Sequence, residues 1–231
     1  RLDRPTGPRR RRGERVRLAT ERYATRRLRR YILSRRPKLV VATHFLAPPS
    51  LGRMIGKGRA DLGLWIIMTD QEAHRFWYTE HAGRYFVANE QIPASLARWG
   101  IDPGRVMVTG IPVHPKWTDP LDAGRVLEKW GLPGDRPIVL LSGGAYFTVG
   151  PVTQIARGIL DRTDAHVVVL AGNNKKLLAD LAEMPESGQR LTGIGWTDKV
   201  HELAHVAALM VTKPGGLITS ELITKGLPMV L

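Results

Sequence analysis

From Lys38 onward, short apolar segments of strand length alternate with segments of helical spacing. The apolar runs include residues 39–42 (Leu-Val-Val-Ala) and 167–170 (Val-Val-Val-Leu). None approaches the roughly 18 apolar residues that a membrane-spanning helix needs. Continuous apolar strands between helices are typical of parallel sheets covered on both faces, so the alternation predicts an α/β fold.

Strands are expected at residues 38–43, 62–68, 84–88, 105–109, 137–142, 166–171, 190–195, 208–212 and 228–231. Helices are expected at residues 90–100, 121–131, 150–161, 174–184, 198–207 and 216–225. Residues 110–115 (Gly-Ile-Pro-Val-His-Pro) are typical of a connection between domains. We therefore expect three parts: a basic segment at 1–36, a partial N-terminal domain at 37–113 and a truncated C-terminal domain at 114–231.

The net charge of +14 is concentrated at the start of the chain. Residues 1–38 hold 15 Arg and one Lys against three acidic residues, so they carry +13 and the remaining residues carry +1. Residues 1–12 contain almost no apolar groups and are expected to be disordered. Residues 14–34 have helical spacing, with Ala24, Leu28, Tyr31 and Ile32 on one side and arginines around them, which predicts a basic amphipathic helix.

The last nineteen residues contain the pattern of a nucleotide site. An apolar strand at 209–212 runs into a Pro-Gly-Gly turn, which opens a short helix that Gly226 and Pro228 end. Glycines allow a ligand to approach the backbone, and the free N–H groups of a helix N-terminus favour an anion such as a diphosphate. Glu221, one turn into that helix, could accept hydrogen bonds from a ribose.

Other short motifs occur in a fixed order before this stretch. They are Thr69-Asp70, His74, Trp77, residues 85–88, 108–113, Pro115, residues 140–144, 150–151 and 171–174. This order resembles the monogalactosyldiacylglycerol synthase and processive diacylglycerol glucosyltransferase family over residues 36–231. That family is similar in fold to the glycosyltransferase that makes the lipid-linked peptidoglycan disaccharide.

The resemblance implies a GT-B-like α/β fold of two Rossmann-like parallel-sheet domains, both incomplete here, that face each other across a cleft. It implies a UDP-sugar-dependent hexosyltransferase whose C-terminal domain binds the donor and whose N-terminal domain binds a lipid acceptor, expected to be diacylglycerol. The transfer would be inverting, with no metal or other cofactor. A base would activate the acceptor hydroxyl, and a helix N-terminus would stabilise the leaving diphosphate.

Carried onto matching positions, the resemblance implies donor-binding roles for ten residues: Gly143, Gly144, Trp196, Thr197, Gly215, Gly216, Leu217, Ile218, Thr219 and Glu221. Glu221 would hold the ribose, residues 215–219 the phosphates and residues 196–197 the uracil, while the 143–144 pair would border the cleft. Each has a structural alternative: a tight turn for the glycines, a solvated carboxylate for Glu221 and core packing for Trp196.

Three residues near strand ends are candidate acid–base groups. Asp70 and His74 follow the apolar strand at 62–68, where open α/β sheets place ligands, and His44 follows the strand at 38–43. The spacing of four also allows a structural role, with Asp70 capping the next helix and His74 packing beside Trp77.

Residues 201–205 (His-Glu-Leu-Ala-His) match the two-histidine pattern of zinc proteases. A zinc site needs a third ligand, and the next carboxylate, Glu221, lies beyond the Pro-Gly-Gly turn. An ordinary surface helix with histidines at its margin is the favoured interpretation.

The basic segment is expected to bind an anionic membrane surface through Arg22, Arg26, Arg27, Arg29 and Arg30. Nucleic acid binding and a merely solvated tail are the alternatives. Nucleic acid is disfavoured because only two tyrosines accompany the arginines. The expected location is therefore the cytoplasm, at the membrane periphery.

The chain also departs from the family. No glycine-rich loop with a histidine precedes the first strand, the donor-sugar loop expected after Leu231 is absent, bulky residues occupy 145–148, and Asn173 stands where Arg or Lys is common. We therefore expect a fragment with little transfer activity by itself. The alternatives are a UDP-sugar epimerase, the peptidoglycan-precursor transferase, or a non-catalytic nucleotide- or lipid-binding module.

Overall fold

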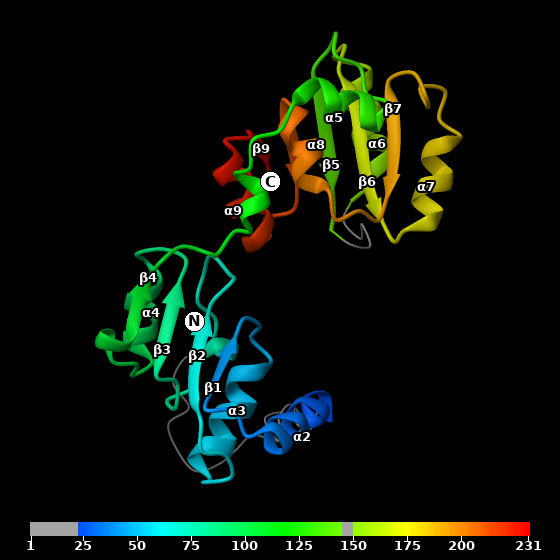
Figure 1. The fold of residues 1–231 in the computed structure, drawn as a ribbon. Helices are drawn as coiled ribbons and strands as arrows, with labels where there is room; N and C mark the ends of the chain where they lie inside the picture. Colours follow the sequence, from blue (N-terminus) through cyan, green and yellow to red (C-terminus); the bar gives the residue numbers. More distant parts are fainter. Residues whose placement is uncertain (1–22, 145–149) are drawn as a thin grey trace. The chain divides into compact units, whose positions relative to one another are not determined.

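The computed structural model describes residues 23–144 and 150–231 (Figure 1). They divide into two compact units, the first ending at Ile111 and the second beginning at Pro112. Each unit contains one parallel sheet with helices packed against it, of four strands in the first unit and five in the second. The predicted α/β class with two Rossmann-like parallel sheets is therefore confirmed.

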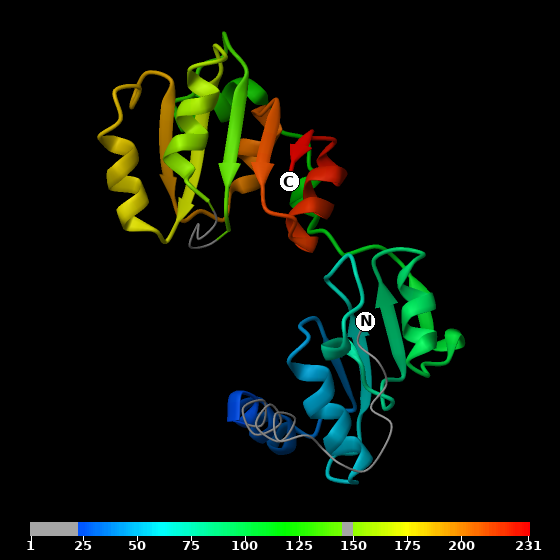
Figure 2. The ribbon, with the colours of Figure 1, turned by 180° about the vertical axis from the view of Figure 1, so that it is seen from behind.

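The first unit has its strands in sequential order, β1-β2-β3-β4. Its strands are β1 (Leu39–Ala42), β2 (Gly63–Ile67), β3 (Arg84–Val87) and β4 (Val106–Val108), and its helices are α2 (Arg26–Arg35), α3 (Ala47–Gly56), α4 (Ile92–Arg98) and the 3₁₀ turns η1 (Arg75–Trp77) and η2 (Pro103–Arg105). Right-handed crossovers that all step in one direction place α3 and α4 on the same face of the sheet (Figure 2).

The core of the first unit lies between that face and the helices. Leu64, Ile66, Trp77 and Tyr85 are fully or almost fully buried there. The Tyr85 hydroxyl donates to the Thr79 carbonyl at 2.8 Å and accepts from the Thr79 N–H at 3.0 Å. Burial raises the pKa of Tyr85 to about 12. The phenol therefore stays neutral and fixes the backbone of Thr79 to strand β3 inside the core.

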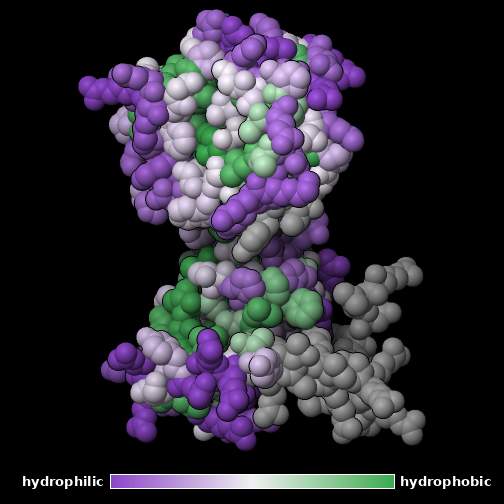
Figure 3. Space-filling model, turned by 90° about the vertical axis from the view of Figure 1, so that its right-hand side faces the viewer, coloured by the Kyte–Doolittle hydropathy of each residue, from purple (hydrophilic) through white to green (hydrophobic). Residues whose placement is uncertain are grey.

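The opposite face of the same sheet is exposed in the described residues. Leu39, Val41, Trp65 and Met107 point to it and are 39–46% exposed. The parallel register pairs Val41 with Trp65, so these side chains share one surface. Apolar surface on this unit is visible in the lower half of Figure 3. The expectation that both faces of each sheet are covered therefore does not hold for this part of the chain.

The second unit has the strand order β7-β6-β5-β8-β9. Its elements are η3 (Pro115–Trp117), α5 (Ala123–Trp130), β5 (Ile138–Ser142), α6 (Val152–Leu160), β6 (His166–Gly172), α7 (Lys175–Ala182), β7 (Leu191–Gly195), α8 (Val200–Val206), β8 (Leu209–Thr212), α9 (Gly216–Lys225) and β9 (Met229–Val230). Helices α6 and α7 cover one face, and α8 and α9 pack on the other (Figures 1 and 2). This sheet is thus covered on both faces, as its continuous apolar strands predict.

Each predicted strand is present within two residues of its expected bounds, and so are the six predicted helices. Helix α2 overlaps the predicted basic helix at residues 14–34 and ends one residue beyond it, and the predicted residues before 23 are outside the described part of the chain. Helix α3 was not predicted, because its Pro48-Pro49 pair and two glycines resemble a loop. Proline is tolerated in a first helical turn, and a Cβ at Gly52 would overlap the Thr79 hydroxyl.

A matched pair of substitutions tests the difference between the two faces of the first sheet. Leu64 and Leu39 lie on neighbouring strands and are 1% and 41% exposed. We expect Leu64→Ala to lower the free energy of unfolding by about 2–5 kcal/mol, because it leaves a cavity, and Leu39→Ala to lower it by less than about 1 kcal/mol. Urea unfolding followed by circular dichroism measures both, and equal losses would contradict the assignment of faces.

Candidate functional site

The order in which the chain adds strands to the second sheet reverses at the central strand, β5. β5 pairs with β6 on one side and with β8 on the other, with Ser142 opposite Thr212. The residues that follow these two strands therefore meet at the carboxyl edge of the sheet. In open α/β sheets, ligands bind at such a switch point. The predicted glycine pairs 143–144 and 215–216 follow β5 and β8, so both lie at this place.

Lys213 lies across Gly144 at the switch point. Gly144 has φ +85°, which favours glycine. A Cβ at this position would stand 3.1 Å from the Lys213 Cε and Nζ atoms. An exposed ammonium thus lies directly over backbone at the point where an anion would bind. The sequence prediction did not assign a role to Lys213, although a basic residue directly before a Pro-Gly-Gly turn was the available signal.

Helix α9 begins at Gly216, with Gly215 as N-cap, and no side chain caps its first turn. The Thr219 hydroxyl donates back to the Gly215 and Gly216 carbonyls at 2.9 and 3.1 Å. Thr219 is 7% exposed, so its hydroxyl is used inside the helix and does not face a ligand. The backbone N–H groups of this first turn remain available to an anion. Leu217, in the same turn, is exposed.

Glu221 is half-buried on α9. Burial raises the pKa of its carboxyl group, while the Trp117 indole and the Lys116 ammonium act in the opposite direction. Trp117 is 2% exposed, and its indole nitrogen has no hydrogen-bond partner of standard geometry. A partly desolvated carboxylate of this kind gains more from a hydroxyl donor than an exposed one does. Glu221 is therefore not the solvated surface carboxylate of the alternative interpretation.

Trp196 follows β7 and is 66% exposed, so the alternative that it packs in the core is wrong. The adjacent Thr197 hydroxyl accepts a hydrogen bond from the Lys199 N–H at 3.0 Å and shapes the loop that enters α8. A large exposed aromatic ring in a loop at this edge is available to stack on a ligand.

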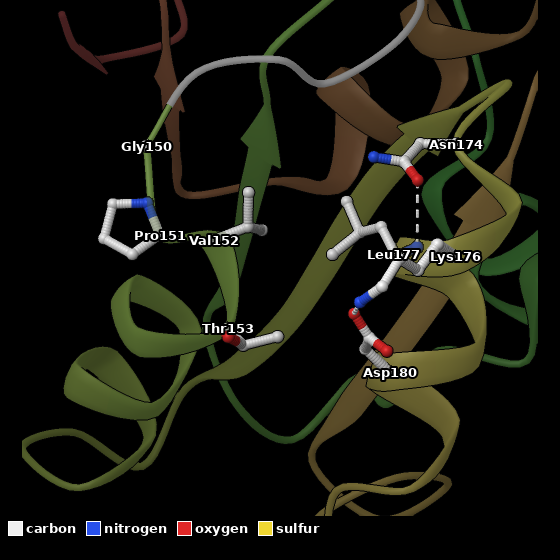
Figure 4. A pocket seen from close by; sticks show the side chains of 8 residues that line it. All are labelled: Gly150, Pro151, Val152, Thr153, Asn174, Lys176, Leu177 and Asp180. Atoms are coloured by element: carbon white, nitrogen blue, oxygen red, sulfur yellow. Dashed lines mark hydrogen bonds and ion pairs between the residues drawn. The ribbon is translucent and has the colours of Figure 1, made fainter.

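A pocket of about 270 Å³ lies between the first turns of α6 and α7 (Figure 4). Asn174 caps α7 by accepting from the Leu177 N–H at 3.0 Å, and Lys176 pairs with Asp180 at 3.0 Å. Thr153 of α6 lines the opposite wall. The sequence prediction did not identify this pocket, and its Asn174, Lys176 and Asp180 side chains make contacts within α7.

The two-histidine segment forms α8 and its side chains have structural contacts. His201 is 8% exposed, with its ring centroid 6.3 Å from that of Trp117. Glu202 accepts hydrogen bonds from Lys129 and from the Trp130 indole. Burial acts to raise the pKa of Glu202, but these bonds outweigh it and lower the pKa. Within residues 23–144 and 150–231, no three acidic or histidine side chains are grouped as metal ligands.

In the first unit, Asp70 and His74 meet. The His74 Nε2 atom lies 2.9 Å from the Asp70 Oδ2 atom, and the Trp77 indole donates to the same oxygen at 2.7 Å. Asp70 therefore binds two side chains and does not cap η1, whose N-cap is His74 without a side-chain bond. The pairing of Asp70 with His74 agrees with both the acid–base and the packing interpretation.

His44 lies near this pair but is not hydrogen bonded to it in the described contacts. Its ring stacks on Phe45 at 4.4 Å, and its Nδ1 atom accepts from the Leu46 N–H at 3.3 Å. Phe45 in turn meets His74 edge-on at 5.3 Å. The three candidate acid–base residues thus belong to one cluster at the carboxyl edge of the first sheet.

The predicted membrane-binding arginines lie on or before α2. Arg26, Arg27 and Arg30 are exposed, and Arg29 is half-buried. Arg22 is outside the described residues. The helix is fixed to the unit by Ile32, which is 7% exposed, and by a 2.9 Å hydrogen bond between the Thr25 and Ser50 hydroxyls. No helix in the described ranges has both the length and the apolar character needed to cross a bilayer.

Comparison with solved structures defines the class of the fold. The chain superimposes on MnaA from S. aureus, solved with UDP, with a TM-score of 0.70 at 15% identity, covering 91% of this chain and 62% of that one. For the UDP-N-acetylglucosamine 2-epimerase of Rickettsia bellii the TM-score is 0.60 at 15% identity, covering 87% and 57%. The two units thus form a GT-B-like α/β protein.

Comparison of sequences identifies the relatives. Residues 6–113 match the model of the monogalactosyldiacylglycerol (MGDG) synthase family. The chain is 29% identical over 208 residues to the processive diacylglycerol beta-glucosyltransferase of Bacillus licheniformis, covering 89% of this chain and 54% of that protein. The chain is a relative of this family, as the order of its motifs predicted. It spans about half the length of the curated relatives that it matches.

The carboxyl group of Glu221 makes stability depend on pH. Because burial raises its pKa, the folded state binds this proton more tightly than the unfolded state does, and stability is lost as pH rises through the raised pKa. We expect Glu221→Gln to increase the free energy of unfolding at pH 7, and to have little effect at pH 4. Urea unfolding at both pH values measures this. Glu128→Gln, on the exposed side of α5, is the control, and a Glu221→Gln effect independent of pH would contradict the assignment.

Proposed function

We propose that the protein takes part in the transfer of a hexose from a UDP-sugar to a lipid hydroxyl, with diacylglycerol as acceptor, at a membrane surface. The observation that carries this proposal is the switch point of the second sheet, where two glycine turns, the α9 N-terminus and Lys213 meet. The named activity of the B. licheniformis relative and the UDP in the MnaA structure support it.

The donor would bind with its diphosphate at the first turn of α9, beside Lys213. Glu221 would accept hydrogen bonds from the ribose, and Trp196 would contact the uracil. In an inverting transfer, a base takes the proton of the acceptor hydroxyl, the acceptor oxygen bonds to the sugar C1 atom, and the bond from C1 to the diphosphate oxygen breaks. Negative charge then grows on the leaving UDP, and the helix N–H groups and the Lys213 ammonium would stabilise it.

A second function of the same fold class is UDP-sugar epimerisation. The likeness to the R. bellii epimerase favours it, because both functions need the same nucleotide-binding unit. The two differ in the acceptor: an epimerase needs no lipid hydroxyl. The exposed arginines of α2 and the family match in the first unit favour the lipid transferase.

Titration with UDP by calorimetry tests the donor site. Hydrogen bonds to a charged group contribute about 1.5–3 kcal/mol, so we expect Glu221→Ala to weaken UDP binding about 10- to 100-fold. We expect Lys213→Met to weaken it about tenfold. Lys225→Met, at the other end of α9, is the control and should leave the affinity unchanged. Absence of UDP binding, or equal binding by all variants, would refute the donor site.

Sedimentation with vesicles tests the membrane surface. Each arginine near an anionic surface contributes about 1 kcal/mol, so replacing Arg26, Arg27 and Arg30 with Gln should lower partitioning onto anionic vesicles about 100-fold. Neutral vesicles should bind both proteins weakly. The control makes the same charge change on other helices, with Gln at Arg98, Arg125 and Arg157. Equal loss in the control would show that net charge alone, and not α2, causes binding.

A further inference from the structure

The 3₁₀ turn η3 contacts two elements of the candidate donor site, and all three belong to the second unit. It packs on α9, the helix of Glu221, and its Trp117 side chain lies in the buried core that α9 shares. The Lys116 ammonium donates to the Asp198 carbonyl at 3.0 Å. Asp198 belongs to the loop that carries Trp196. One short turn therefore connects the helix of Glu221 with the loop of Trp196.

The backbone of η3 is fixed by its own hydrogen bonds. The His114 side chain caps the turn, because its Nδ1 atom accepts from the Lys116 N–H at 3.1 Å. The His114 carbonyl accepts from the Trp117 N–H at 3.0 Å, and the Thr118 hydroxyl donates to the Pro115 carbonyl at 2.8 Å. The proline ring also fixes φ at the first position of the turn. The two side chains that reach the donor site thus start from a backbone with little freedom.

The indole N–H of Trp117 is a buried donor next to the Glu221 carboxyl group. Trp117 is 2% exposed, and its N–H has no partner of standard geometry among the described residues. Burial raises the pKa of Glu221, and the Trp117 indole, followed by the Lys116 ammonium, acts to lower it. A buried donor without an aligned acceptor is costly. Such a hydrogen bond tightens when a bound ligand fixes the carboxylate.

We propose that η3 is the positioning element of the donor site: Trp117 holds the Glu221 carboxylate toward the ribose hydroxyls of a nucleoside diphosphate, and Lys116 holds the loop of Trp196. The inference rests on the proposed function and assigns it two further residues. Trp117 is buried and acts through Glu221, so it is a positioning residue. A carboxylate held in this way discriminates between a ribose and a sugar that lacks its hydroxyls.

Calorimetric titration of the full chain with UDP and with 2′,3′-dideoxy-UDP tests the role of Trp117. Trp117→Phe keeps an aromatic ring in the core and removes the N–H. We expect it to weaken UDP binding about tenfold and dideoxy-UDP binding by less than about twofold. The ratio of the two affinities cancels any loss of folded protein, which lowers both equally. Trp130→Phe, which removes an indole N–H from the Glu202 carboxylate, is the matched control and should leave both affinities unchanged.

NMR titration of the free chain tests the contact without a nucleotide. Trp117→Phe should raise the pKa of Glu221 further, because the N–H favours the ionised carboxylate. In the wild-type chain, the Trp117 indole N–H signal should shift as Glu221 titrates, and Glu221→Gln should abolish that shift. Two other titratable groups face this place: Lys116, and His201 of α8, whose ring centroid lies 6.3 Å from that of Trp117. A shift that persists in Glu221→Gln comes from these groups and contradicts the contact.

Hydrogen exchange tests the contact of Lys116 with the loop. Without the ammonium, the loop after β7 should open more often. Exchange of the Lys199 N–H, which bonds to the Thr197 hydroxyl at 3.0 Å, should therefore be faster in Lys116→Met. Arg125→Gln removes an equal charge from an exposed position on α5 and should leave the rate unchanged. The same rate in Lys116→Met and the wild-type chain would refute the role of Lys116.

The outcomes separate this inference from the proposed function. If the wild-type chain binds UDP and Trp117→Phe weakens UDP and dideoxy-UDP by the same factor, the positioning role is overturned and the donor site remains. Absence of UDP binding by the wild-type chain refutes the donor site and, with it, the role toward a ribose. An unchanged pKa of Glu221 in Trp117→Phe overturns the contact whether or not UDP binds.

Discussion

The candidate donor site depends on the pairing of β5 with two neighbours. β5 is hydrogen bonded to β6 on one side and to β8 on the other. The chain therefore adds strands in one direction from β5 to β7 and in the opposite direction from β8 to β9. Only this order brings the loop after β5 and the turn after β8 to one place. The approach of Lys213 to Gly144 and the position of the α9 N-terminus both follow from it.

The strands could be predicted from sequence because their apolar runs are continuous and strand-sized, a signal that tertiary packing reinforces. Helix α3 could not, because its prolines and glycines have local preferences that the contact of Gly52 with Thr79 overrides. The spacing of Asp70 and His74 suggested a pair, and the structure shows one. The position of Lys213 over Gly144 could not be read from sequence, because the two residues are 69 positions apart and three strands lie between them.

The exposure of individual side chains could not be predicted from sequence either, because it depends on contacts between distant elements. Trp196 and Trp117 are both tryptophans, yet the side chain of Trp196 is 66% exposed and that of Trp117 is 2% exposed. Thr219 was expected to face a phosphate, but a hydroxyl inside a helix can satisfy itself on the carbonyls of the preceding turn. Local patterns therefore identified the turn as a whole, while the role of each side chain depended on packing between elements.

The exposed face of the β1–β4 sheet couples the stability of the first unit to its surroundings. Water contacts Leu39, Val41, Trp65 and Met107, so covering them releases free energy in proportion to the apolar area removed, about 25 cal/mol per Å². Any molecule or segment that covers this face binds the folded unit and not the unfolded chain, and so raises its unfolding free energy by mass action. The melting temperature of this unit is therefore a measure of how fully the face is occupied, as well as of the contacts inside it.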